Sequence, residues 1–115
     1  MTGGVLPAQI PGAVRARILR LTERLSTDLQ VNQIFLYGSF AVGTYGADSD
    51  IDIAVFLAEG SSCGLETYLK LNRLIGDSEY DIQLQVFPED ELCDPCGIVE
   101  EIAAHGILLW KRQDR

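Results

Sequence analysis

The sequence predicts an α+β fold in which a small mixed β-sheet is covered by helices. Three observations predict it. Segments with helical periodicity alternate with short apolar runs that read as strands. A helical segment joins two of these strands, which favours a parallel pair. Another two strands are linked by a glycine-rich loop whose polar residues share a site only if the strands run antiparallel.

Three helices are expected. The first begins near Pro11, a residue common in the first turn of a helix, and runs to about Asp28. A second covers about 64–75, and a short third covers about 95–104 before His105 and Gly106, a usual helix end. The first helix carries its apolar side chains on one face, at Val14, Ile18, Leu21 and Leu25.

Four strands are expected, at residues 31–37, 50–57, 80–87 and 107–110. The second reads DIDIAVFL and alternates strictly, so its two aspartates, Ala54 and Phe56 share one face. The other face carries the aliphatic residues Ile51, Ile53, Val55 and Leu57. Such alternation predicts a strand with different surroundings on its two faces.

Composition bounds the possible functions. With 115 residues, the chain suits a single domain over 1–115, with residues 1–9 as a loose N-terminal segment. A net charge of −8 argues against direct binding of nucleic acid, which needs clustered Lys and Arg. No apolar run is long enough for a membrane span, and no signal peptide is recognisable. Three cysteines do not suggest a disulfide scaffold, so a reducing cytoplasm is expected.

A pair of carboxylates stands at the start of the second strand. Asp50 and Asp52 are two residues apart and point to the same face, where they repel each other unless a proton or a cation intervenes. Mg²⁺ takes oxygen ligands, often one or two carboxylates with substrate phosphates. Asp81 has the matching place on the next strand. Three such carboxylates could hold two metals. The structural alternative is a strand edge with one face exposed to solvent.

The dipeptide Gly38-Ser39 supplies the other half of the candidate site. A glycine at a strand end lets a ligand approach the backbone closely, and the following N–H groups and the Ser39 hydroxyl could hold phosphate oxygens. This loop is not a Walker A motif, because no GxxxxGK[ST] pattern is present. Cys93 and Cys96 form a CxxC pair, but too few further ligands accompany them to indicate zinc.

The segment GSFAVGTYGADSDIDIAVF resembles the signature of the polymerase-β-type nucleotidyltransferases: Gly-Ser, about ten residues, then Asp-x-Asp entering an apolar strand. The short chain and its closing EEIAAHGILLW resemble the minimal nucleotidyltransferase (MNT) branch. This resemblance implies a palm-like nucleotidyltransferase fold. It also implies Mg²⁺, ATP as substrate and transfer of AMP to a hydroxyl. Asp50 and Asp52 would ligate metal, and Asp81 would complete the site as a further ligand or as a base.

The same resemblance implies a partner. Many MNT proteins are antitoxins whose partners are all-helical HEPN-type proteins, and some modify that partner with AMP. Here Val42 stands where members usually carry Arg in a GSxARG pattern. Two alternatives therefore stay open beside the enzyme: an antitoxin that neutralises its partner by occlusion, and a small-molecule nucleotidyltransferase, which would need a further substrate domain.

Overall fold

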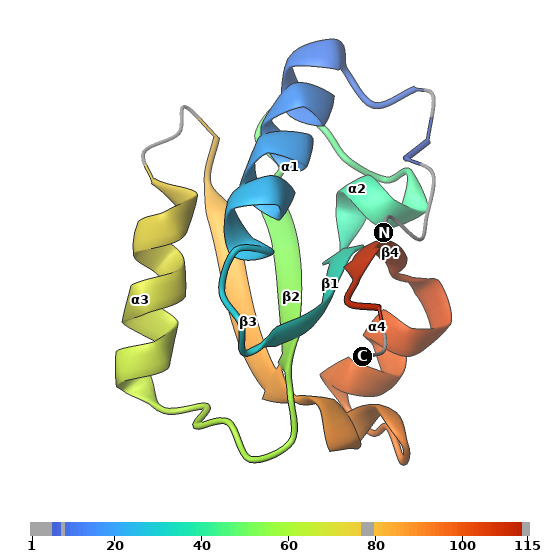
Figure 1. The fold of residues 1–115 in the computed structure, drawn as a ribbon. Coiled ribbons are helices and arrows are strands. Elements are labelled where there is room, and N and C mark those ends of the chain that lie inside the picture. Colours follow the sequence, from blue (N-terminus) through green and yellow to red (C-terminus); the bar gives the residue numbers. More distant parts are fainter. Residues whose placement is uncertain (1–5, 8, 77–79, 114–115) are drawn as a thin grey trace.

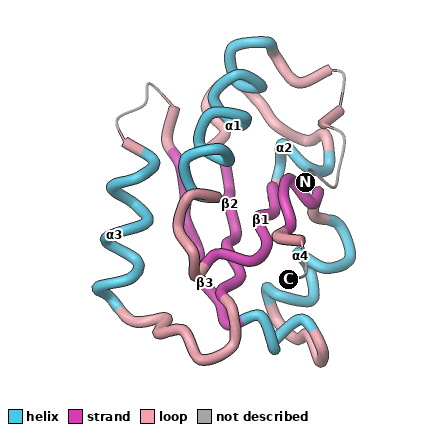
Figure 2. The backbone as a smooth tube through the Cα atoms, in the orientation of Figure 1, coloured by secondary structure: helices cyan, strands magenta, loops and turns pink. Residues whose placement is uncertain are grey.

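A four-stranded mixed sheet forms the centre of the computed structural model, which describes residues 6–7, 9–76 and 80–113 (Figures 1 and 2). The strand order is β3-β2-β1-β4. All four strands lie close to their predicted positions, at β1 Val31–Tyr37, β2 Ile51–Leu57, β3 Ile82–Pro88 and β4 Ile107–Lys111. The α+β prediction, with a mixed sheet and helices packed on it, is confirmed.

The strand directions bring the two halves of the sequence motif together. β1 pairs with β2 in the antiparallel sense, with Tyr37 opposite Asp52, so β1 ends where β2 begins. β2 pairs with β3 in the parallel sense, and the register places Ile51 beside Ile82. Gly38, Asp50 and Asp81 consequently lie at the same end of three neighbouring strands, as expected from the sequence.

Two helices cover one face of the sheet. α1 (Gly12–Leu25) and α3 (Leu65–Ile75) pack on the aliphatic face of β2, and the main hydrophobic core lies between them and the strands (Figure 1). The predicted apolar stripe of α1 is fully confirmed, because all four of its residues are buried. Burying one such side chain stabilises the fold by about 1.5–3 kcal/mol.

The opposite face of the sheet is covered by α4 (Ile98–His105), which packs its Val99 and Ile102 on Ala54 and Phe56. This second core also includes aromatic residues: the ring of Phe56 stacks on Phe87 and meets Phe35 edge-on. The alternation predicted for β2 thus separates two different cores. The aspartates continue the face that α4 covers, one step beyond its apolar part.

Element boundaries differ from the predictions in places. α1 ends at Leu25, not near residue 28, because the N–H groups of Thr27 and Asp28 turn back three residues to the carbonyls of Arg24 and Leu25. α4 starts at Ile98, not near residue 95, since Gly97 has a positive φ that a helix does not continue through. Two short elements were not predicted, α2 (Ser39–Val42) and a 3₁₀ turn at Glu89–Leu92, because four residues show no periodicity.

The N-terminal segment is described at Leu6, Pro7 and Gln9, and the rest of the expected loose stretch lies outside the described residues. Leu6 is buried in the main core, and the Pro7 carbonyl accepts a hydrogen bond from the Arg15 guanidinium at 2.6 Å. The Gln9 carbonyl accepts another from the Tyr45 hydroxyl. These contacts hold the described part of the segment against α1 and the loop before β2.

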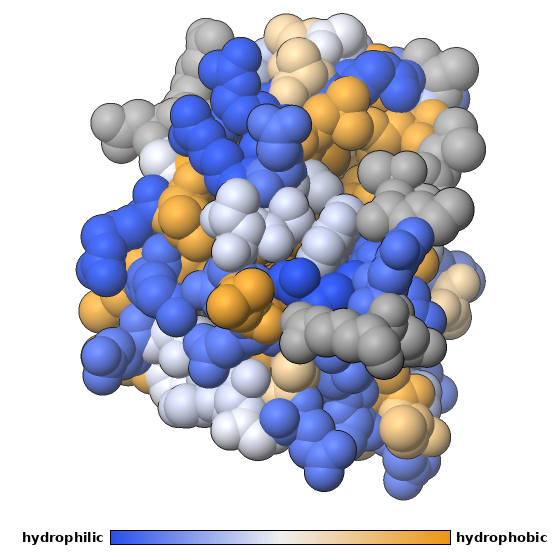
Figure 3. All heavy atoms as spheres, viewed as in Figure 1, coloured by the Kyte–Doolittle hydropathy of each residue, from blue (hydrophilic) through white to orange (hydrophobic). Residues whose placement is uncertain are grey.

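Hydrophilic side chains cover much of the face that carries α1 and α3, with apolar residues showing between them (Figure 3). Within the described part of the chain, no helix is both long and apolar enough to cross a membrane.

Candidate active site

The turn that leaves β1 is built around Gly38. This residue has φ +75° and ψ −155°, a conformation that is accessible almost only to glycine. A Cβ at this position would overlap Oδ2 of Asp52 and lie 3.0 Å from its Cγ. The glycine therefore does two things: it lets the chain turn sharply into α2, and it leaves room for the Asp52 carboxylate directly against the backbone.

The two aspartates at the start of β2 influence each other electrostatically. Asp52 is half-buried, and this loss of solvent raises the pKa of its carboxyl above the ordinary value. The nearby charge of Asp50 raises the same pKa further. The predicted repulsion between the pair is thus present in the fold, and a cation is what would relieve it.

Tyr37 is a site residue that the sequence interpretation missed. It stands opposite Asp52 in the antiparallel pair and is buried at the end of β1. Burial, with the Asp52 charge as a smaller cause, raises the pKa of its phenol to about 12. Its hydroxyl therefore ionises at a higher pH than an ordinary tyrosine. Two signals in the sequence could have identified Tyr37: the alternation of the strand and its place directly before the Gly-Ser turn.

Asp81 lies beside the pair through its backbone. Its carbonyl accepts a hydrogen bond from the Ile51 N–H at 2.8 Å, and its side chain is exposed just before β3. The residue that stands directly opposite Asp52 on β3 is Gln83, which was not predicted as a site residue. Among the described residues, no three His, Cys, Asp or Glu side chains are grouped closely enough to hold a metal ion. The structure thus joins Asp50 and Asp52 through the effect of one charge on the other, and no third such side chain completes a metal-binding group with them in the described part of the chain.

The Gly38-Ser39 loop has a limited set of available donors. The N–H groups of Ala41 and Val42 donate to the Gly38 carbonyl, and that of Gly43 donates to Ser39. The first N–H groups of a helix have no carbonyl of that helix within reach, so those of Ser39 and Phe40 have no helical acceptor at this turn. They are the expected phosphate donors of this loop.

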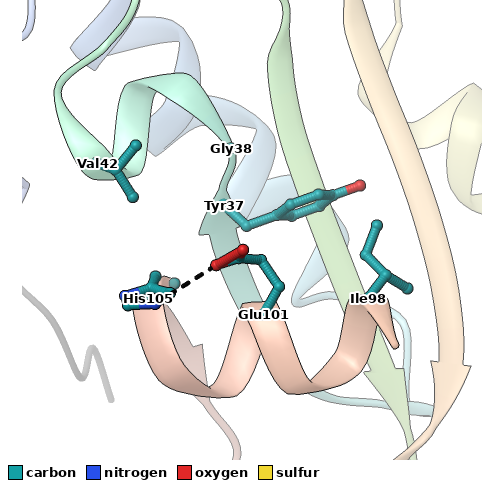
Figure 4. Close-up of a pocket in the computed structure, with 7 residues that line it drawn as sticks. Tyr37, Gly38, Val42, Ile98, Glu101 and His105 are labelled. Atoms are coloured by element: carbon teal, nitrogen blue, oxygen red, sulfur yellow. Dashed lines mark ion pairs between the residues drawn. The ribbon is translucent and has the colours of Figure 1, made fainter. Parts of the chain in front are cut away.

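A pocket of about 310 Å³ lies between α2 and α4 and begins at the Gly-Ser turn (Figure 4). Figure 4 shows Val42 pointing from α2 toward α4, and the Tyr37 ring above Glu101 and Ile98 with its hydroxyl directed away from Val42. His105 and Glu101 stand on α4 at the opposite wall, where His105 Nε2 lies 3.7 Å from Glu101 Oε2. His105 was read from the sequence as a helix-end residue, which it is, but its place beside this pocket was not predicted.

A lysine and two cysteines lie away from this turn or are exposed. Lys70 of α3 pairs with Asp28 at 3.0 Å and donates to Gln30, so it faces away from the Gly-Ser turn. The thiols of Cys93 and Cys96 are exposed.

Comparisons with known proteins agree with this geometry. The sequence model of the family described as "Polymerase beta, Nucleotidyltransferase" matches residues 20–115. A crystal structure of a candidate nucleotidyltransferase from Sulfolobus solfataricus is 20% identical, with a TM-score of 0.60, 91% of this chain covered and 92% of that one. The search of curated proteins found no match.

Two further similar structures are toxin–antitoxin complexes. One contains AMP-PNP; it is 24% identical with a TM-score of 0.58, and 85% of this chain and 73% of that chain are covered. The other, a mutant of MntA-HpeT, is 23% identical with a TM-score of 0.57 and coverages of 91% and 76%. At these identities the likeness establishes the fold. Together with the family match over most of the chain, it shows that this chain belongs to the polymerase-β nucleotidyltransferase family.

Proposed function

We propose that the protein is a Mg²⁺-dependent nucleotidyltransferase that transfers AMP from ATP to a hydroxyl on a partner protein, as the antitoxin half of a toxin–antitoxin pair. The observation that carries the proposal is the carboxylate of Asp52, held against the backbone of Gly38 and close enough to Asp50 to be perturbed by it. A strand end that serves only the fold gains nothing from two carboxylates that repel each other. Here they stand beside a position whose conformation requires glycine.

The residues present fit one Mg²⁺ ion bound together with a nucleotide. Asp50 and Asp52 supply two hard oxygen donors whose repulsion a divalent cation would relieve, and Mg²⁺ is commonly bound by one or two carboxylates plus substrate phosphates. When bound, the ion supplies charge neutralisation of the triphosphate. A second ion would draw on Asp81, whose exposed side chain is not grouped with the other two in the part of the chain that the structure describes.

The chain's own groups have distinct roles in the transfer. The backbone N–H groups and hydroxyl at Ser39, next to Gly38, hold phosphate oxygens and orient the nucleotide. The acceptor oxygen forms a bond to the α-phosphorus, the bond from that phosphorus to the bridging oxygen breaks, and pyrophosphate leaves. Asp81 takes the acceptor proton as a general base. Its exposure before β3 suits a group that must meet an acceptor arriving from outside.

The proposed acceptor is a HEPN-type, all-helical partner. The support is the resemblance of the Gly38–Asp52 segment to MNT antitoxins, and the similar folds of two toxin–antitoxin complexes, one of them with AMP-PNP. The described fold is one sheet with its covering helices, which suits an acceptor hydroxyl carried by a second molecule.

A second candidate function is neutralisation of the partner by occlusion alone. It is favoured by Val42, which occupies the position where a cation is usual in the MNT signature and is 51% exposed on α2. An exposed apolar side chain there adds contact surface and removes an attraction for phosphate.

One paired experiment separates the two functions. The protein is co-expressed with the product of the neighbouring gene, and transfer of labelled AMP and inhibition of the partner are both measured for the unmodified chain and for Asp50→Asn and Asp81→Asn. The enzyme proposal expects transfer to fall ~10²-fold or more in both variants, with inhibition falling alongside. Inhibition that persists when no transfer is ever detected, even with the unmodified chain, would establish occlusion and refute the enzyme.

A further inference from the structure

The pocket between α2 and α4 is not used by the roles described above, although it opens directly from the Gly-Ser turn. Its walls come from three elements: Tyr37 and Gly38 at the end of β1, Val42 on α2, and α4 with the turn that follows it. A volume of about 310 Å³ is at the lower end of the range for small-molecule sites. Such a pocket is wide enough for one planar ring system and too small for a folded segment of a partner.

The chemistry of the walls indicates an uncharged, partly aromatic ligand. Val42 and Ile98 are 51% and 46% exposed, so two aliphatic side chains stand open to solvent at the mouth. The Tyr37 ring also lines the pocket and lies above Glu101 and Ile98 in Figure 4. Apolar walls with an aromatic ring are typical of sites where planar rings pack.

Charge disfavours the phosphate end of a nucleotide in this pocket. Among the described residues that line it, Glu101 carries a carboxylate and has no second carboxylate beside it to share a divalent cation, so it repels a triphosphate. The pair between Glu101 and His105 is 3.7 Å long, with both side chains about 60% exposed, so it holds the carboxylate only weakly. Glu101 can therefore accept a hydrogen bond from an N–H group at the edge of an entering ring.

The strand order also separates this pocket from the acceptor. Asp81 precedes β3 at the edge of the sheet, whereas the pocket starts from β1, and β2 with its aspartates runs between them. In an in-line displacement the attacking hydroxyl lies opposite the leaving pyrophosphate, and the nucleoside oxygen is a third substituent of the α-phosphorus that points off this line. The pocket opens from the Gly-Ser turn on the side away from Asp81, so a nucleoside seated there leaves the approach past Asp81 open to the acceptor.

Resting on the proposed function, we propose that the pocket between α2 and α4 binds the nucleobase of the nucleoside triphosphate, with Tyr37, Val42 and Ile98 as its apolar walls. Glu101 selects a base that presents an amino group. The ligand class is an amino-substituted purine nucleotide, and its phosphates and its base are bound by separate parts of the chain.

The test compares ligands that share phosphates and differ in the base. Dissociation constants are measured calorimetrically, with Mg²⁺, for ATP, for purine riboside triphosphate (which lacks the amino group) and for inorganic tripolyphosphate. We expect the unmodified chain to bind ATP at least ~10-fold more tightly than tripolyphosphate. Val42→Phe fills the pocket mouth and should remove that difference while leaving tripolyphosphate binding unchanged. Glu101→Ala, which removes the acceptor oxygen, should remove most of the preference for ATP over purine riboside triphosphate.

Matched controls are Leu29→Phe, at an apolar side chain that is 76% exposed, and Glu100→Ala, at the neighbouring exposed residue of α4. Neither residue lines the pocket, so both variants should keep the unmodified affinities. If ATP and tripolyphosphate bind the unmodified chain equally, or if Val42→Phe keeps the difference, the base lies elsewhere and the inference is overturned. If neither ligand binds the unmodified chain, the proposed function fails too, which distinguishes the two failures.

Discussion

Replacing Gly38 by Ala tests the geometry on which the candidate site depends. The backbone at this residue lies in a region that costs a non-glycine residue about 1–3 kcal/mol. The added Cβ would overlap the Asp52 carboxylate, and overpacking of this kind costs about 1–3 kcal/mol more. We expect Gly38→Ala to lower the free energy of unfolding by about 2–6 kcal/mol and to displace Asp52 from the turn.

Gly97→Ala is the matched control for the backbone. Gly97 has φ +59° and ψ −132°, similar to Gly38, but no heavy atom stands within 4 Å of a Cβ built on it. The Gly97→Ala variant should lose only the part of the free energy of unfolding that comes from the backbone conformation. Gly12→Ala, with ordinary φ and open space, should be neutral or slightly stabilising.

The assay is urea unfolding of the three variants, followed by the fluorescence of Trp110 and by circular dichroism. A Gly38→Ala variant that loses at least ~1 kcal/mol more than Gly97→Ala supports the contact between the turn and the carboxylate. If the two variants lose the same amount within ~0.5 kcal/mol, Asp52 does not lie against Gly38, and the reasoning is refuted.

Four further outcomes are expected. Asp52→Asn should raise the stability of the metal-free protein at pH 7, because the raised pKa of Asp52 means that its charged form destabilises the fold; in pH-dependent thermal melts this gain should vanish as the pH falls toward the ordinary pKa of 3.8. In an alkaline absorbance titration, Tyr37 should ionise near pH 12 in the native protein and at lower pH in Asp52→Asn, whereas an unchanged curve would argue against their proximity. Val42→Arg should tighten calorimetrically measured binding of magnesium tripolyphosphate ~5-fold, an attraction of about 1 kcal/mol at an exposed position, and no change would mean that Val42 lies too far from the phosphates. Arg17→Met should cost about 1.5–3 kcal/mol in urea unfolding, because Arg17 donates at 2.6 Å to the Ile75 carbonyl at the end of α3, while Arg20→Met, on the exposed side of α1, should be nearly neutral.

Strand alternation explains why the sequence predicts most of this fold. In β2 the strict period of two separates the aliphatic face from the face of Asp52, Ala54 and Phe56, and the structure places a different core on each. The antiparallel pairing of β1 with β2 also follows from the sequence, because Gly38 and Asp52 share a site in no other arrangement. The burial pattern of a long periodic segment can be predicted from its sequence, as it was for β2.

The parts that escaped prediction depend on contacts between distant residues. The face of Tyr37 follows from alternation, but its burial depends on α4, which arrives more than sixty residues later. Gln83 stands opposite Asp52 because the parallel register is fixed by packing along the whole of β3, which the sequence does not state. The pocket beside Glu101 exists only once α2 and α4 are placed on the sheet, and α2 itself is too short for any periodicity.

Calorimetric titration of ATP into the protein, with and without Mg²⁺, tests the central claim most directly. The paired carboxylates should repel a bare triphosphate and accept one that carries a divalent ion. We therefore expect binding with Mg²⁺, loss of at least ~10-fold in affinity in EDTA, and a similar loss with Mg²⁺ in Asp52→Asn. Equal affinity in Mg²⁺ and in EDTA, or full Mg²⁺-dependent binding by Asp52→Asn, would contradict the assignment of Asp50 and Asp52 as the metal-binding pair of a nucleotidyltransferase.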